Sequence, residues 1–116
     1  MIRQKLKEGA IGTARRLIER AQRERAASVV ALAMLEAEAD LAEHRNERAK
    51  GRYLAIVTRY PHTSEAELSL FAAAQLSRGQ AGIDLLQRYL ARYPDGRFAK
   101  EARRLLDALE TRNSPQ

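Results

Sequence analysis

The sequence predicts an all-α fold made of antiparallel helical hairpins. Hydrophobic residues make up 45% of the 116 residues, and only three prolines and six glycines interrupt them, a composition that favours helix. Apolar residues recur at spacings of three and four along most of the chain. The dipeptide Tyr-Pro occurs at Tyr60-Pro61 and again at Tyr93-Pro94, and a period of 33 residues is typical of stacked helical hairpins. We therefore expect six or seven helices in antiparallel pairs.

Two helices are predicted before residue 45. The first follows Gly12-Thr13, and residues 1–7 are the remnant or the start of its partner. The second begins near Ala26, and its apolar side consists of Val29, Leu32, Leu35, Ala39 and Ala42. We assign residues 1–25 to a partial repeat and residues 26–61 to a complete one.

The next helix is expected to start after a turn near His44, with Asn46 as its N-cap. Its inward side chains are predicted to be Ala49, Tyr53, Ile56, Val57 and Tyr60.

A second complete repeat is predicted for residues 62–94. Thr63 and Ser64 can each cap a helix, and Ser64 and Glu67 have the spacing of a capping box; the helix that follows is expected to run to Arg78-Gly79. Its apolar side is Leu68, Phe71, Ala72, Gln75 and Leu76, and that of the following helix is Ile83, Leu86, Leu90 and Tyr93. Pro94 ends this second helix, because the residue before a proline avoids the α conformation.

The chain is expected to close with a capping helix over residues 96–111 and a disordered tail at residues 113–116. The apolar face of that helix is Phe98, Ala99, Ala102, Leu105, Leu106 and Leu109. Residues 1–112 are thus interpreted as a single domain, a size that suits one hydrophobic core.

Composition limits the function only loosely. The net charge is +6, and the 17 arginines against four lysines indicate either a guanidinium-based surface or a GC-rich genome. The absence of cysteine excludes disulfides and a cysteine nucleophile. No apolar run is long enough to span a bilayer, and residues 1–8 contain no signal peptide. The compartment is cytoplasmic if Met1 is the natural start, and periplasmic or at the outer membrane if the chain is a piece of an envelope protein.

The segments RYPHTSEA (residues 59–66) and RYPDGRFA (residues 92–99) resemble the joints of tetratricopeptide-like (TPR-like) repeats. The resemblance covers residues 26–110 and is nearest to the repeats of the bacterial envelope proteins BamD and YbgF (CpoB). It departs from the usual pattern at Ala26, where a proline would close the first unit, and at Ala37 and Asp40, which replace a glycine and an aromatic residue. The resemblance implies a short right-handed superhelix whose first helices line a concave groove for a protein or peptide partner.

An acidic stripe is predicted on the second helix. Glu36, Asp40 and Glu43 share one helical face, at spacings of four and three residues. The stripe is either part of the binding groove or an ordinary solvated face that Arg45, Arg48 and Lys50 partly neutralise. With the groove orientation that the resemblance implies, we expect the partner to contact Glu36, Asp40, Glu43, Glu67, Gln75 and Arg78.

The remaining chemistry argues against catalysis. His44 and His62 stand apart in separate turns, so no metal site, catalytic group or cofactor is expected. Arginines flank the first and last helices, but acidic residues are interleaved with them, so a nucleic-acid binder is the less favoured hypothesis. The preferred function is a non-enzymatic scaffold that binds protein. The alternative is a piece of a larger bacterial regulator or lipoprotein whose repeats mediate self-assembly, which leaves a homo-oligomer open.

Overall fold

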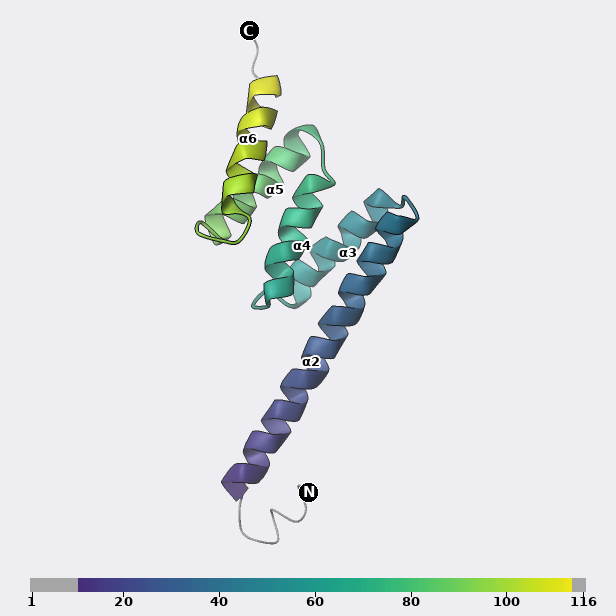
Figure 1. The fold of residues 1–116 in the computed structure, drawn as a ribbon, viewed down its shortest axis with the longest axis vertical. Coiled ribbons are helices and arrows are strands. Elements are labelled where there is room, and N and C mark those ends of the chain that lie inside the picture. Colours follow the sequence, from purple (N-terminus) through teal and green to yellow (C-terminus); the bar gives the residue numbers. More distant parts are fainter. Residues whose placement is uncertain (1–10, 114–116) are drawn as a thin grey trace. The chain divides into compact units, whose positions relative to one another are not determined.

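The computed structural model describes residues 11–113, with the side chains of residues 16–25 and 29–112. This part of the chain contains helices and no strand, which confirms the all-α prediction for it (Figure 1). The five helices of residues 11–113 are α2 (Ile11–Ala42), α3 (Asn46–Arg59), α4 (Ser64–Gln75), α5 (Gly79–Arg92) and α6 (Ala99–Asn113). The helix expected within residues 1–7 and residues 114–116 of the predicted tail lie outside the described residues, whereas Asn113, also assigned to that tail, belongs to α6.

The chain divides into two compact units, residues 1–32 and residues 33–116. In the first unit, the side chains of residues 16–25 are exposed except for that of Leu17, which is half-buried. The helix α2 runs without interruption from Ile11 to Ala42, so the prediction of two helices that meet near Ala26 was wrong. No proline or glycine occurs between residues 13 and 50, and therefore nothing in this stretch breaks a helix.

The buried side of α2 also differs from the prediction. Val29, Leu32 and Leu35, expected to face inward, are 45%, 58% and 60% exposed, whereas Ala37 and Asp40 are buried. Alanine is so frequent in this helix that both of its sides are apolar. The prediction relied on hydrophobicity alone and therefore chose the side with the larger residues. The side that is buried contains the small Ala37 and a carboxylate whose partner lies on α3.

In the second unit, consecutive helices pack on one another: α3 on α4, α4 on α5, and α5 on α6. The core between them consists of Val57, Leu70, Phe71, Ala74, Leu86, Tyr89, Ala99 and Ala102. Phe71 and Phe98 stack face to face, with their ring centroids 4.8 Å apart. Buried alanines in α3, α4 and α6 allow the helices to approach closely. The predicted inward faces of α3 and α5 are confirmed at Ala49, Tyr53, Ile56, Val57, Ile83 and Leu86, whereas in α4 the buried face is shifted and only Phe71 of the predicted set is fully buried.

Each Tyr-Pro dipeptide ends a helix, as predicted. Tyr60 closes α3 with φ −128° and ψ 55°, and Tyr93 closes α5 with φ −127° and ψ 64°. Both backbones have left the α region, as expected for a residue that precedes proline. The near-identity of the two pairs of angles supports the interpretation of residues 60 and 93 as equivalent repeat positions.

Of the two candidate caps of α4, Thr63 occupies the N-cap position, whereas the predicted cap of α3 is displaced by one residue. The helix α4 is capped by Thr63, whose hydroxyl accepts a hydrogen bond from the Ala66 amide at 3.1 Å, and not by Ser64. The helix α3 starts at Asn46, so its N-cap position is Arg45, which makes no side-chain cap. Glu67 therefore has no role in a capping box.

Candidate functional site

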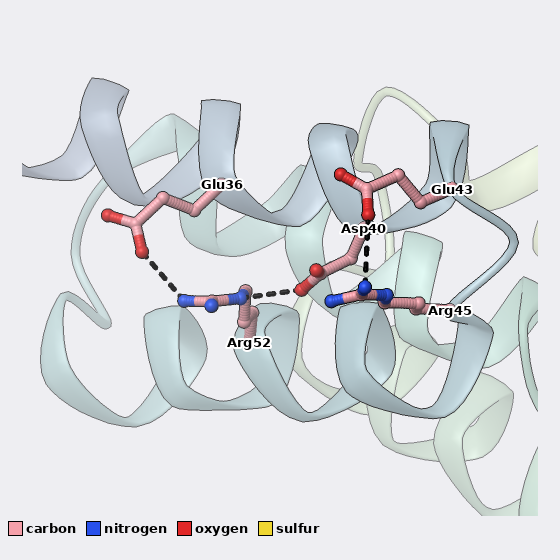
Figure 2. Close-up of polar contacts among 5 residues, drawn as sticks. All are labelled: Glu36, Asp40, Glu43, Arg45 and Arg52. Atoms are coloured by element: carbon pink, nitrogen blue, oxygen red, sulfur yellow. Dashed lines mark hydrogen bonds and ion pairs between the residues drawn. The ribbon is translucent and has the colours of Figure 1, made fainter.

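The acidic residues of α2 pair with an arginine of α3. Nε of Arg52 donates to Asp40 Oδ2 at 2.6 Å, and Nη1 of the same residue donates to Glu36 Oε2 at 2.7 Å (Figure 2). The turn that brings the two helices together contains His44 in the left-handed region (φ 62°), and the Arg45 amide donates to the Asp40 carbonyl across it at 2.8 Å. Glu36 and Asp40 thus join two antiparallel helices.

The members of this cluster differ in how deeply their side chains are buried. Asp40 is only 6% exposed, and a buried carboxylate needs a partner of opposite charge. The hydrogen bond to Asp40 raises the pKa of Arg52, and the charges of Asp40 and Glu36 add to it. Glu43 lies at the surface, 3.3 Å from Arg45. A guanidinium that bridges two carboxylates fixes the hairpin.

The sequence interpretation missed Arg52. It expected neutralisation by basic residues nearer the turn, namely Arg45, Arg48 and Lys50, and only Arg45 pairs with one of the three acids. In an antiparallel hairpin, residues at equal distances from the turn face each other. Glu36 and Arg52 both lie eight residues from His44, so this symmetry was the available signal.

Glu67 is part of a polar network at the second Tyr-Pro joint. Its Oε2 accepts from the Tyr89 hydroxyl at 2.7 Å and from the Arg97 amide at 2.8 Å. The Tyr89 hydroxyl accepts in turn from the Phe98 amide at 2.9 Å. Burial, followed by the hydrogen bond to Glu67, raises the pKa of Tyr89 to about 12. Glu67 therefore links α4, α5 and the start of α6.

Gln75 and Arg78 lie in a different place, a surface hollow of about 500 Å³ in the second unit. Its lining comes from the start of α3, the end of α4 and the start of α5, and consists of Asn46, Glu47, Lys50, Gln75, Leu76, Ser77, Arg78 and Ala81. The hollow presents two cations, one carboxylate and two side-chain amides. Charged groups of both signs beside neutral amides suit a polar ligand that has backbone amides more than they suit an apolar ligand.

The six predicted contact residues are thus distributed over separate places. Glu36, Asp40 and Glu43 lie at the α2–α3 hairpin, Glu67 at the second joint, and Gln75 and Arg78 in the hollow. Among residues 11–113, no group of three or more His, Cys, Asp or Glu side chains is arranged to hold a metal ion. Within the same range, no helix has the length and apolar character that crossing a membrane requires.

Comparisons with known proteins leave the family open. No family model, no curated protein and no solved structure matches this chain.

Proposed function

We propose that this chain is a non-enzymatic interaction module, a TPR-like scaffold that binds a peptide or a partner domain. The packing of consecutive helices in residues 33–113 and the equivalent backbone angles at Tyr60 and Tyr93 support a helical repeat. The resemblance of the Tyr-Pro segments to TPR-like joints supports the same interpretation and favours a bacterial protein, with association to the envelope as one setting. Scaffolds of this class act through their surfaces and not through a reaction.

The observation that carries the proposal is the hollow around Gln75 and Arg78. A peptide backbone offers both donors and acceptors, and the hollow offers Lys50 and Arg78 against Glu47, with the amides of Asn46 and Gln75 between them. Of the six contact residues, Gln75 and Arg78 are proposed to contact the partner directly.

The other four residues have supporting roles in this proposal. Glu36, Asp40 and Glu67 hold the helices in place, since each already accepts a hydrogen bond from another element. Glu43 is exposed beside Arg45 and remains available at the surface.

Selection of binding peptides from a random library, followed by calorimetry, tests this site. Arg78→Glu is expected to weaken the selected peptides at least tenfold, because it reverses one of the two cations of the hollow. Arg88→Glu is the matched control: it makes the same charge change at an exposed position of α5 outside the hollow, and binding should be unchanged. Peptides that bind both variants equally well would place the binding surface elsewhere.

Self-assembly is the second candidate, and the exposed apolar side chains of α2 favour it. A nucleic-acid binder is less favoured, because part of the basic surface of α6 is already engaged: Arg104 pairs with Glu101 at 3.3 Å, and Arg103 donates to the Pro94 carbonyl at 2.7 Å. Retention of DNA or RNA on a filter that falls steeply with salt would revive that hypothesis.

A further inference from the structure

The helix α2 has an uneven charge distribution along its length. Residues 16–25 contain four arginines and two glutamates, residues 26–35 contain no charged side chain, and residues 36–43 contain four acids and no base. A helix favours acidic side chains near its N-terminus and basic ones near its C-terminus. The first turn of α2 has no acid and its last turn has no base, so the charges run against the helix dipole.

The uncharged middle of α2 contains exposed apolar residues. Ile18, Val29, Leu32 and Leu35 are the exposed large apolar side chains of the described residues, and all four belong to this helix. At the other end of the chain, Leu105, Leu106 and Leu109 of α6 pack against the core, and its charged residues face solvent. Exposed apolar side chains that lie close together are typical of a surface that binds another protein. On α2, unlike on α6, large apolar side chains face solvent.

We propose that a second copy of this chain packs against α2 in antiparallel orientation, with the two-fold axis between Val29 and Leu32. Val29 of each copy then packs on Leu32 of the other. Four residues further out on both sides, Arg25 of one copy meets Glu36 of the other. The basic segment of each helix thus lies along the acidic segment of its partner, and the two helix dipoles are opposed.

The side chains that form the ion pairs suit this role. Arg25 is exposed and has no hydrogen bond or ion pair among the described residues. Glu36 accepts from Arg52, yet its side chain remains 47% exposed, and a carboxylate has room for a second donor. One guanidinium neutralises only one of the two charges of Glu36 and Asp40, so the segment stays acidic. Arg52 also holds the Glu36 side chain in a fixed position before the second copy binds.

The charge pattern selects this occupant over others. In a parallel pair of copies, Arg25 would face Arg25, and Glu36 would face Glu36. An unrelated helix would fit only if its acidic, apolar and basic segments followed one another in the opposite order. A second copy of α2 in antiparallel orientation has this order. With four large apolar residues per copy, the interface is small, and we expect a dissociation constant of about 10–100 µM. This surface lies on α2 and the hollow on α3–α5, so either proposal can fail alone.

Sedimentation equilibrium of the whole chain from 5 to 500 µM tests the dimer. We expect a monomer–dimer equilibrium that Leu32→Asp abolishes and that Arg25→Glu weakens about tenfold at low salt. The matched controls are Ala108→Asp and Arg88→Glu, the same kinds of change at exposed positions of α6 and α5. Circular dichroism should show unchanged helix content in every variant. A monomer at 500 µM, or a dimer that Leu32→Asp does not affect, would overturn the proposal.

Single-cysteine variants test the orientation, because the natural chain has no cysteine. Gln22 and Ala39 are exposed positions of α2 that face each other across the proposed axis. A mixture of Gln22→Cys and Ala39→Cys should form a disulfide between the two variants under mild oxidation. Neither variant alone should do so, since like positions are then about 25 Å apart along the helices. Efficient cross-linking of each variant with itself would show a parallel pair and reject the antiparallel one.

Discussion

The two Tyr-Pro joints have the same backbone turn but are held by different groups. In the first, the Thr63 amide donates to the Tyr60 carbonyl at 3.2 Å; in the second, the Gly96 amide donates to the Tyr93 carbonyl at 3.0 Å. Thr63 and Gly96 are also 33 residues apart, so they occupy the same position of the repeat. Because this position is a threonine in one turn and a glycine in the other, the two turns satisfy their backbone amides in different ways.

The backbone amides at the start of the next helix, or just before it, need hydrogen-bond acceptors. In the first joint the solution is local, because the Thr63 hydroxyl accepts from the Ala66 amide and donates to the Tyr60 carbonyl at 2.8 Å. In the second, Glu67 of α4 accepts from the Arg97 amide and Tyr89 of α5 accepts from the Phe98 amide. The second joint therefore depends on three helices, and we expect it to be the more sensitive of the two to substitution.

The largest difference should come from Gly96→Ala. A Cβ at Gly96 would collide with Glu67 Oε2 and would lie 2.6 Å from the Tyr89 hydroxyl, both members of the network. We expect a loss of about 2–4 kcal/mol in the free energy of unfolding, as for other overpacked sites.

The matched control is Gly51→Ala in α3, where a Cβ meets nothing within 4 Å. It should stabilise the protein by about 0.5–1 kcal/mol through helix propensity. Denaturant unfolding measures both variants. Equal effects at the two glycines would show that the network at the second joint is not tightly packed.

Tyr89→Phe should have the next largest effect, about 1–3 kcal/mol, because it leaves the buried Phe98 amide without its acceptor. It should also change the dependence on pH. The folded-state pKa of Tyr89, about 12, lies above the usual value near 10, so the stabilisation is complete below pH 10 and disappears as the pH rises through 12.

Unfolding measured between pH 9 and pH 12 checks this prediction. The decline in stability should be shallower in Tyr89→Phe than in the natural protein. Burial also raises the pKa of Tyr53, so Tyr53→Phe is the control that removes the contribution of the other tyrosine. An unchanged slope in Tyr89→Phe would contradict the role given to its hydroxyl.

The contrast between the joints marks how far the sequence could predict the structure. Both Tyr-Pro joints were predictable, because the restriction that proline places on the preceding residue is local. The roles of Glu67 and Arg52 depend on residues 12 to 30 positions away, and no spacing along one helix encodes such pairs. The buried face of α2 was mispredicted for a related reason: where alanine surrounds a helix, packing chooses the buried side, and the sequence does not.

Thr63→Ala should cost about 1 kcal/mol, the usual value for an N-cap hydroxyl. Ser64→Ala is its control, since among the described residues the Ser64 hydroxyl donates only to the neighbouring Glu65 side chain, and the change should alter stability by less than about 0.5 kcal/mol. Thermal unfolding of the two variants compares them. A larger loss in Ser64→Ala would restore the capping box that the sequence predicted.

Replacing Arg92 should have the smallest effect on the free energy of unfolding, and that effect should be confined to the first joint. Its Nη2 donates to the Pro61 carbonyl of the first joint at 2.6 Å. Because Arg92 immediately precedes the second Tyr-Pro, this hydrogen bond connects the two joints. Arg103 makes the corresponding contact with the Pro94 carbonyl at 2.7 Å. Both guanidinium groups are exposed, and Ala at either position should cost only about 0.5 kcal/mol.

Amide hydrogen exchange separates the two arginines where global unfolding cannot. Arg92→Ala should speed exchange at Thr63 and Ala66, because the carbonyl that it releases belongs to the turn before α4. Arg103→Ala should act instead on Arg97 and Phe98. If Arg92→Ala speeds exchange equally at all four amides, the joints open together, and the local anchoring of the first joint is not independent of the second.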